Sequence, residues 1–363
     1  MKIYFDSQIF QLQEYGGISR YFSELISAIK SASPDESVKV GAKFVRNRYI
    51  VKDNDLHLKN SFKSVPKRLL LNIDSKRSIP TDVSILHSTY YNNMFLPRNL
   101  NIPNVITIHD MIPEDFSEMS ESEIQKTDKA RYILNADGII CVSNFTMKRL
   151  TKYFPNLKAP IEVIPLASNL KSDINFDYNL SSFESRTRDF IYVGPRYGYK
   201  NFKLILEATE ILRISTNYRF RIIAVGGGKF SAMEEYDLAK RGLSNIVVQN
   251  EMNDFELSRA YSTSLALIYP SLSEGFGIPQ IEAFSFGCPV ISSNLGALRE
   301  YGEGISLNFD AASAESLAHR MLQMLTITPL DFERISEQSI IQSKKFSWLD
   351  TATKTTNFYK KLI

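Results

Sequence analysis

The sequence predicts an α/β protein with two doubly wound domains that face each other across a cleft. Apolar, β-branched runs alternate with helical periods along the whole chain, which is the pattern of βαβ units and parallel sheets. A polar stretch without periodicity, residues 168–189, interrupts this alternation once and is the expected linker. A chain of 363 residues is also too long for one ordinary hydrophobic core.

The first half of the chain, residues 1–170, contains the elements of one domain. The helix expected at Gly17–Lys30 is the clearest, because its apolar residues recur with the spacing of one buried helix face. Two more helices are expected at Glu121–Asn135 and Asn144–Tyr153. The strands are expected at Lys2–Phe5, Val38–Val45, Asp82–His87, Asn104–His109, Gly138–Val142 and Ile161–Ile164.

The second half, residues 186–346, repeats the alternation. Its strands are expected at Phe190–Val193, Phe220–Val225, Asn245–Gln249, Leu265–Tyr269, Pro289–Ser292 and Gly304–Leu307. Its helices are expected at Lys203–Ile214, Ser231–Arg241, Asp254–Ser262, Pro279–Phe286, Ala314–Leu325 and Asp331–Gln342. Pro279 suits the first position of its helix and Gly287 suits the helix end, which places Glu282 in the first turn.

Composition and cysteine usage favour a cytoplasmic globular protein. Hydrophobic residues make up 44% of the chain and charged residues 23%, as in soluble domains. No run of 18 apolar residues and no secretory signal is found. Cys141 and Cys288 lie in apolar runs and are expected to be buried thiols in a reducing compartment. The four histidines form no cluster with cysteine, which argues against structural zinc.

The segment Lys39–Arg77 is strongly basic, with eleven Lys and Arg residues against three Asp. Such a segment attracts an anionic membrane surface, an anionic substrate or nucleic acid, although a solvated loop explains it equally well. We expect it to form the acceptor side of the molecule together with the aromatic loop HSTYYNNMF, and to touch the inner face of the cell membrane. The Asp-x-Asp spacing at Asp53–Asp55 has no strand before it, so we expect no metal there.

Chemically active side chains follow the predicted strands, at the sheet edge where doubly wound domains bind ligands. His109 follows one strand, Arg196 and Lys200 follow another, and Gly226, Gly227 and Gly228 follow the next. Two cations in one loop can neutralise the charge of a leaving diphosphate. Taken alone, these cations are better explained as ordinary surface residues, and His109 could be a core histidine.

The stretch EGFGIPQIE places Glu274 and Glu282 on either side of Gly275 and Gly277. The glycines let the backbone come close to an anion or to hydroxyls, and a carboxylate near a helix N-terminus can accept from ribose hydroxyls. The simpler alternatives are a solvated acid for Glu274 and stabilisation of the helix dipole by Glu282. Near the N-terminus, Gly16 and Gly17 precede a helix, where they form either a tight turn or an approach for phosphate.

These motifs together resemble the retaining GT-B glycosyltransferases of the large family four group. EGFGIPQIE is similar to the paired-glutamate signature of that family, PRYGYKNF to its Arg and Lys-Asn segment, and GGISRYFSEL to its N-terminal glycine loop and helix. TIHDMIP, VSNFT and FSW match in the same order, so the resemblance covers nearly the whole chain. The opening FDSQIF resembles most the bacterial O-antigen and capsule enzymes, often mannosyltransferases.

The resemblance implies that the second domain holds a nucleoside diphosphate sugar, with GDP-mannose favoured. Arg196 and Lys200 would hold the diphosphate, and Glu282 the ribose. Glu274 would bind the sugar hydroxyls together with the backbone of the loop after it, Gly275, Phe276, Gly277 and Ile278. The backbone near Met252 would meet the base. The chain departs from the family pattern at REYGEGISL, which lacks an expected Asp.

The resemblance also assigns roles in the first domain. His109 would contact the sugar near the reacting carbon, Gly16 and Gly17 would face the donor phosphates, and the helix within Ser347–Ile363 would pack back onto this domain. Arg20 could face either the diphosphate or water. The family transfers a sugar with retention of configuration and without a metal or another cofactor. The implied acceptor is a glycan or a polyprenyl-linked glycan, and no nucleic acid is expected.

Four other functions fit parts of the sequence. An epimerase of the same fold would need no acceptor surface, and a phosphorylase would carry a pyridoxal lysine on a longer chain. A silent binding protein could use Lys39–Arg77 to hold a membrane or nucleic acid. It would not need the four residues Glu274, Arg196, Lys200 and His109. A retaining glycosidase could use Glu274 and Glu282 as its carboxylate pair, but not the two cations.

Overall fold

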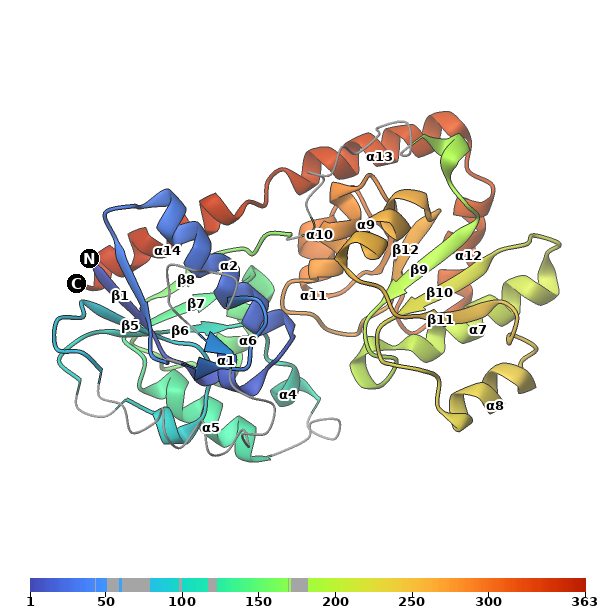
Figure 1. The fold of residues 1–363 in the computed structure, drawn as a ribbon. Helices are drawn as coiled ribbons and strands as arrows, with labels where there is room; N and C mark the ends of the chain where they lie inside the picture. Colours follow the sequence, from blue (N-terminus) through green and yellow to red (C-terminus); the bar gives the residue numbers. More distant parts are fainter. Residues whose placement is uncertain are drawn as a thin grey trace. The chain divides into compact units, whose positions relative to one another are not determined.

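The computed structural model describes residues 1–42, 44–50, 59–60, 79–97, 100–116, 123–168, 170 and 182–363 (Figure 1). The chain forms two compact units. Unit 1 consists of Met1–Leu166 and Ser347–Ile363, and unit 2 of Ala167–Phe346. Most of the polar stretch expected as a linker lies outside the described residues.

Unit 1 is built on a six-stranded parallel sheet in the order β2-β1-β5-β6-β7-β8. The expected strand Val38–Val45 is wrong as one element, because the chain leaves this sheet after Val40 and pairs again in a separate two-stranded sheet. The strands are β1 Lys2–Phe5, β2 Ser37–Val40, β3 Phe44–Val45, β4 Lys59–Asn60, β5 Ile85–Ser88, β6 Asn104–Ile108, β7 Gly138–Cys141 and β8 Ile161–Val163.

The helices of unit 1 include two that the sequence did not predict, α1 and α4. They have five and four residues, which is too short to show a helical period. The described helices are α1 Gln8–Leu12, α2 Gly17–Ala32, α4 Ile112–Asp115, α5 Glu123–Leu134, α6 Asn144–Tyr153 and the C-terminal α14 Trp348–Leu362. A 3-10 turn, η3, spans Asn93–Phe95.

The C-terminal helix α14 packs against α2 within unit 1, where both can be followed in Figure 1. Tyr359 is fully buried, and its hydroxyl lies 2.5 Å from Nδ1 of His87 on β5. Trp348 lies 5.9 Å from the ring of Tyr21 on α2. A side chain at Gly138 would come within 2.6 Å of Leu362, so α14 also runs close over β7. The end of the chain therefore completes the core of the unit in which it began.

Unit 2 has a six-stranded parallel sheet in the doubly wound order β11-β10-β9-β12-β13-β14. The strands are β9 Asp189–Val193, β10 Arg221–Val225, β11 Val247–Asn250, β12 Ala266–Tyr269, β13 Val290–Ser293 and β14 Leu307–Phe309. The last strand begins at Leu307, where the prediction ended it. The helices are α7 Phe202–Ser215, α8 Ala232–Lys240, α9 Asp254–Thr263, α10 Ile278–Ser285, α11 Gly296–Gly302, α12 Ala314–Leu325 and α13 Pro329–Ser343.

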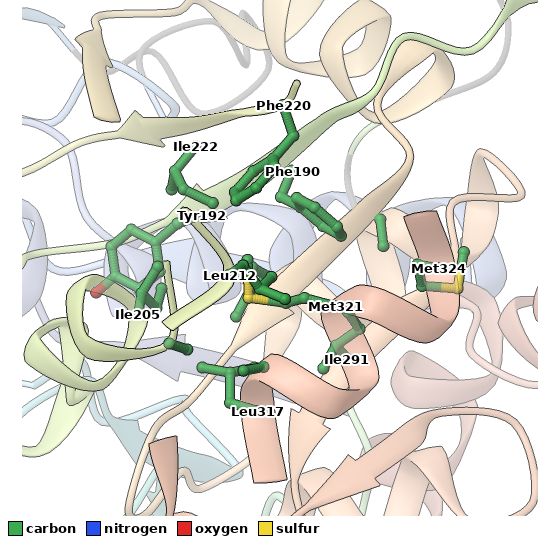
Figure 2. Packing of buried hydrophobic residues seen from close by; sticks show 14 of the residues in the cluster. Phe190, Tyr192, Ile205, Leu212, Phe220, Ile222, Ile291, Leu317, Met321 and Met324 are labelled. Atoms are coloured by element: carbon green, nitrogen blue, oxygen red, sulfur yellow. The ribbon is translucent and has the colours of Figure 1, made fainter. Parts of the chain in front are cut away.

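The core of unit 2 lies between the sheet and helices α7 and α12 (Figure 2). Phe190 and Tyr192 of β9 project from the sheet and meet Ile205 and Leu212 of α7 and Met321 of α12. All five are no more than 2% exposed. Each large side chain of this kind contributes about 1.5–3 kcal/mol by leaving water. This packing fixes the sheet against the two helices, and because the strands are parallel their carboxyl ends lie at one edge of the sheet.

Cys141 and Cys288 are both free and buried, as predicted. Among the described residues, no helix is long and apolar enough to span a bilayer.

Candidate active site

Lys200 and Glu274 meet at the point where the strand order of unit 2 reverses. Lys200 follows β9 and Glu274 follows β12, and these strands are neighbours at the topological switch point. Lys200 Nζ lies 2.6 Å from Glu274 Oε1, and each side chain is 11% exposed. The Lys200 ammonium also lies 5.4 Å from the centre of the Tyr269 ring. The sheet topology thus places a partly desolvated ion pair where such sheets bind ligands.

Helix α10 begins one residue earlier than expected. Its N-cap is Gly277 at φ +90°, and Pro279 is its second residue, so the prediction of Pro279 as the first residue is wrong. Glu282 is consequently the fifth residue, beyond the first turn, which contains no acid. Its carboxylate is buried and accepts a hydrogen bond from the Tyr261 hydroxyl at 3.3 Å. The alternative that Glu282 stabilises the helix dipole from the first turn is therefore excluded.

The loop between Glu274 and α10 is held from both ends. A Cβ at Gly277 would approach Leu298 Cδ2 to 2.6 Å, so this position requires glycine for space as well as for its left-handed φ. The ring of Phe276 is buried against Tyr301 and Phe346, at 4.7 and 5.7 Å between ring centres. The side chain of Phe276 therefore anchors the loop and leaves ligand contacts to the backbone.

Arg196 lies in the predicted loop, but its side chain is turned into unit 2 and is only 4% exposed. It donates to Glu234 and to the backbone that follows β10. Met252, which is half-buried, lies at the carboxyl end of β11, directly before the N-cap residue of α9.

In unit 1, the two N-terminal glycines have different surroundings. Gly16 is the N-cap of α2 with an extended φ of 168°, so neither glycine is needed for a left-handed backbone. A Cβ at Gly16 would lie 2.2 Å from Oε1 of Gln13, the atom that accepts from the Ser19 backbone N–H at 3.1 Å. Gly16 therefore makes room for a side-chain cap, whereas Gly17 faces open space. Arg20 lies 5.5 Å from the Tyr49 ring.

His109 lines a cavity of about 320 Å³ at the carboxyl ends of β5 and β6. Its ring packs 4.9 Å from the centre of the Tyr21 ring. The pKa of His109 is lowered to about 4, mainly by burial; Asp110 raises it and nearby Lys129 lowers it, both by less than burial does. His109 is therefore neutral at pH 7. Its Nε2 atom is buried and has no hydrogen-bond partner among the described residues, which suits a neutral donor or acceptor for a ligand hydroxyl.

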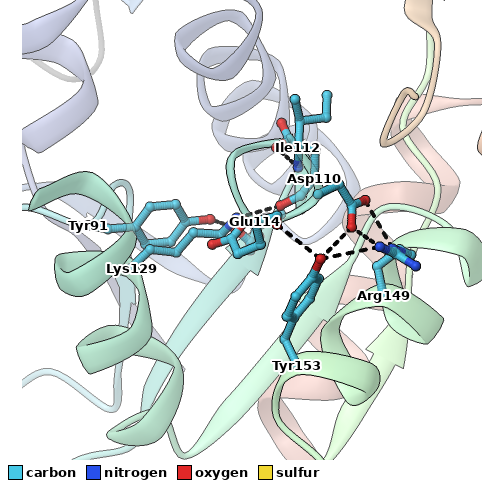
Figure 3. Close-up of polar contacts among 9 residues, drawn as sticks. Tyr91, Asp110, Ile112, Glu114, Lys129, Arg149 and Tyr153 are labelled. Atoms are coloured by element: carbon cyan, nitrogen blue, oxygen red, sulfur yellow. Dashed lines mark hydrogen bonds and ion pairs between the residues drawn. The ribbon is translucent and has the colours of Figure 1, made fainter. Parts of the chain in front are cut away.

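Lys129 holds the loop that forms one wall of this cavity (Figure 3). Its ammonium donates to the backbone oxygen of Asp110 at 2.6 Å and to Glu114 at 3.0 Å. The Asp110 carboxylate also accepts from the Ile112 backbone N–H at 3.0 Å. Arg149 and Tyr153 of α6 bind Asp115, which fixes α4 from its other side.

The cavity is also lined by Tyr90 and Tyr91, whose stacked rings have their centres 5.3 Å apart. The sequence predicted that their loop lies on the acceptor side, but it did not predict the cavity between this loop and α5. The position of two tyrosines directly after a strand was the available signal. Sequence reasoning missed Asp128 and Lys129, because a helical period does not show which polar residues line a cavity.

Comparison with known proteins places the chain in a family. Residues 15–171 match the family model for Glycosyltransferase Family 4, and residues 177–340 match that for Glycosyl transferases group 1. The chain belongs to the group 1 glycosyltransferases. The O-antigen chain mannosyltransferase B of Escherichia coli is 26% identical to this glycosyltransferase over 95% of the chain and 96% of that protein.

Solved structures agree on the fold of this glycosyltransferase. Sucrose-phosphate synthase from Thermosynechococcus elongatus superposes with a TM-score of 0.76 at 20% identity, covering 100% of this chain and 99% of that one. Anabaena HepE in complex with UDP and glucose gives a TM-score of 0.69 at 15% identity, covering 99% of this chain and 100% of that one. The two doubly wound parallel sheets are those of the GT-B fold, as the sequence predicted.

Some expectations for this glycosyltransferase lie outside the described residues. Asp53–Asp55 and most side chains of the basic segment Lys39–Arg77 are among them. Of the cations that the structure does describe there, Arg48 pairs with Glu14 at 3.0 Å. The roles of the site residues toward a donor remain predictions.

Proposed function

We propose that this glycosyltransferase transfers a hexosyl group, most favourably mannose from GDP-mannose, to a glycan or polyprenyl-linked acceptor. The reaction would retain the anomeric configuration, require no metal ion and serve the synthesis of an O-antigen or capsule polysaccharide in the cytoplasm. The observation that carries the proposal is the Lys200–Glu274 ion pair at the switch point of unit 2. The name of the Escherichia coli relative supports mannose and O-antigen, and the HepE complex supports a nucleoside diphosphate.

In this proposal, the ion pair opens when the donor binds. The Lys200 ammonium turns to the diphosphate, whose leaving charge it neutralises, and the Glu274 carboxylate accepts from hydroxyls of the transferred sugar. Each ion exchanges one polar partner for another, so neither is left buried and unpaired at any stage. Glu282, the fifth residue of α10, accepts from the ribose hydroxyls.

Within unit 1, we place the sugar of the acceptor in the cavity beside His109. The tyrosine rings offer an apolar face to a pyranose, and the carboxylates of Asp110 and Asp128 can accept from its hydroxyls. A neutral His109 can bind a hydroxyl without repelling a cationic transition state, because burial keeps its pKa near 4.

The test is turnover of GDP-mannose and of UDP-linked hexoses in the presence of a short mannose-containing glycan. We expect release of the nucleoside diphosphate and a new glycosidic bond whose anomeric configuration, measured by NMR, matches that of the donor. A product of inverted configuration would contradict the retaining mechanism. Conversion of the donor into its epimer without an acceptor would instead show an epimerase.

We also propose that the basic segment Lys39–Arg77 binds an anionic membrane surface. The wild-type protein should sediment with vesicles containing phosphatidylglycerol but not with purely zwitterionic vesicles, and the bound fraction should fall with added salt. Reversing the charges of Lys63, Lys67 and Arg68 should abolish this binding, whereas reversing the exposed Lys344 and Lys345 of unit 2 should not. Equal binding of both variants would refute the proposal.

A further inference from the structure

The loop after β10 contains three consecutive glycines whose shape has to be maintained by other residues. Gly226, Gly227 and Gly228 have φ values of +89°, +72° and +72°. Glycine adopts these angles easily but does not favour them over others, so an isolated loop of this kind would sample many conformations. Something outside the loop must select the one observed.

Arg196 supplies this constraint through all five of its N–H groups. Nη1 donates to the backbone oxygens of Gly226 at 2.8 Å and Gly228 at 3.0 Å, and Nη2 donates to that of Lys229 at 3.1 Å. The remaining two N–H groups donate to the Glu234 carboxylate at 2.7 and 3.3 Å. A guanidinium has only five donors, so none is left for a ligand.

Packing reinforces the same arrangement. The guanidinium carbon lies 4.7 Å from the centre of the Phe230 ring, which closes the far end of the loop. A Cβ at Gly227 would lie 2.9 Å from Nη1, so glycine is required there for close approach. The Gly226–Lys229 loop and the Arg196 side chain are therefore packed tightly against each other.

Glu234 connects Arg196 and the Gly226–Lys229 loop to helix α8. Its Oε2 atom accepts from the Ser231 backbone N–H at 2.8 Å and completes the capping box of the helix, while Oε1 binds Arg196. The hydrogen bond from Arg196 lowers the pKa of Glu234 to about 2, so the carboxylate is charged throughout the neutral range.

The loop also contacts the segment that leads to Lys200. Gly194 donates its backbone N–H to Val225 at 2.9 Å, and a Cβ at Gly226 would lie 3.4 Å from the Gly194 oxygen. A change in the loop would therefore shift the backbone between β9 and Lys200. The loop itself lies at the sheet edge where doubly wound domains bind nucleotides.

We infer that Arg196 and Glu234 are positioning residues that lock the Gly226–Lys229 loop for binding of the nucleoside diphosphate, and that Arg196 does not itself bind the phosphates. This inference rests on the proposed function of unit 2 as the donor-binding unit. It replaces the role that the family resemblance implied for Arg196. Of the two cations that the sequence singled out in the loop after β9, Lys200 is then the one that meets the diphosphate.

The experiment is a double-mutant cycle read by calorimetric binding of GDP and UDP. Arg196→Ala and Glu234→Ala should each weaken binding by roughly 10- to 100-fold, the range found for residues that orient direct ligands. The double variant should be no weaker than the single variants, because both remove the same constraint. Arg196→Lys should not rescue binding, because one ammonium cannot replace five donors in a fork.

A direct phosphate contact predicts the opposite pattern. Removing Glu234 would then release Arg196, so Glu234→Ala would bind the nucleotide equally well or more tightly, and this result would overturn the inference. The matched control is Ser231→Ala, which removes the hydroxyl that caps α8 and donates to Glu234 Oε2 at 2.9 Å, but leaves the Arg196–Glu234 contact in place. It should change nucleotide binding by less than about twofold, since a cap mainly affects helix stability.

Hydrogen exchange of the free protein separates this inference from the proposed function. Without nucleotide, the amide hydrogens of residues 226–230 should exchange faster in Arg196→Ala than in the wild type. In Ser231→Ala their exchange rates should equal those of the wild type. Unchanged exchange there in Arg196→Ala would refute the locking role even if nucleotide binding fell. If the wild type bound no nucleotide, the donor proposal would fail, and this exchange result would still decide whether Arg196 holds the loop.

Discussion

Glu274→Ala should lower the turnover of the nucleoside diphosphate sugar by about a hundredfold to a thousandfold, and Lys200→Ala should do the same. Preorganised charges that meet developing charge in a transition state are worth about this much when one is deleted. The Lys200 and Glu274 charges lie 2.6 Å apart and are almost excluded from water, so deletion of one also leaves the other buried and unpaired.

The measurement is release of nucleoside diphosphate, with the melting temperature of each variant recorded to exclude unfolding. The nearby pair Lys203–Glu207 provides the control, because it is also a Lys–Glu ion pair but is much less buried. Its side chains are 75% and 35% exposed, with 3.5 Å between the charged atoms. Alanine at either control position should keep turnover within about twofold, as expected of an exposed ion pair. Full activity of either Lys200→Ala or Glu274→Ala would count decisively against the site.

Tyr359→Ala should lower the free energy of unfolding of unit 1 by about 3–5 kcal/mol, the usual cost of deleting a large buried aromatic side chain. The ring is completely buried between α14 and the sheet, and its hydroxyl is the partner of His87 Nδ1. Tyr359→Phe keeps the ring and should cost only about 1–3 kcal/mol, because it leaves the buried His87 nitrogen without its partner.

The chain provides its own probe for this experiment. Trp348, the single tryptophan of the sequence, lies at the start of α14, so its fluorescence in a urea titration follows unit 1. The matched control is Asn357→Ala, at a position two residues before Tyr359 on the exposed face of α14. It should change the free energy of unfolding by less than about 0.5 kcal/mol. Equal urea midpoints for Tyr359→Ala and Asn357→Ala would show that α14 does not complete the core.

The elements that the sequence predicted best are those with clear ends. Helices Asn144–Tyr153 and Ala314–Leu325 agree with the structure at both ends, and each follows a serine that caps its backbone. The helices α1, α4 and α11 were missed, because none exceeds seven residues and short helices carry too little periodicity. The prediction placed strand β14 too early, because Ile305 and Ser306 donate to the Gly302 oxygen in a turn and the strand begins only at Leu307.

The site was predictable in position but not in its pairings. The rule that ligands bind at strand ends selected Lys200 and Glu274 as candidates, and the fold brings these two side chains into contact. It could not show that Arg196 is turned inward, because its partners lie about 30 residues further along the chain. Nor could it show that Gly16 makes room for the Gln13 side chain. A glycine is required both where a side chain of the protein packs closely and where a ligand approaches, so the sequence does not distinguish the two cases.

The central claim, that unit 2 binds a nucleoside diphosphate through the Lys200–Glu274 edge, is tested most directly by thermal-shift titration with ADP, CDP, GDP, UDP and GDP-mannose. A ligand present at 100 times its dissociation constant stabilises the protein by about 2.7 kcal/mol, so binding should raise the melting temperature by several degrees. We predict this shift for at least one nucleotide, strongest for GDP, with its loss in Lys200→Ala and its retention in Lys203→Ala. The absence of a shift with every nucleotide, or an undiminished shift in Lys200→Ala, would contradict the account.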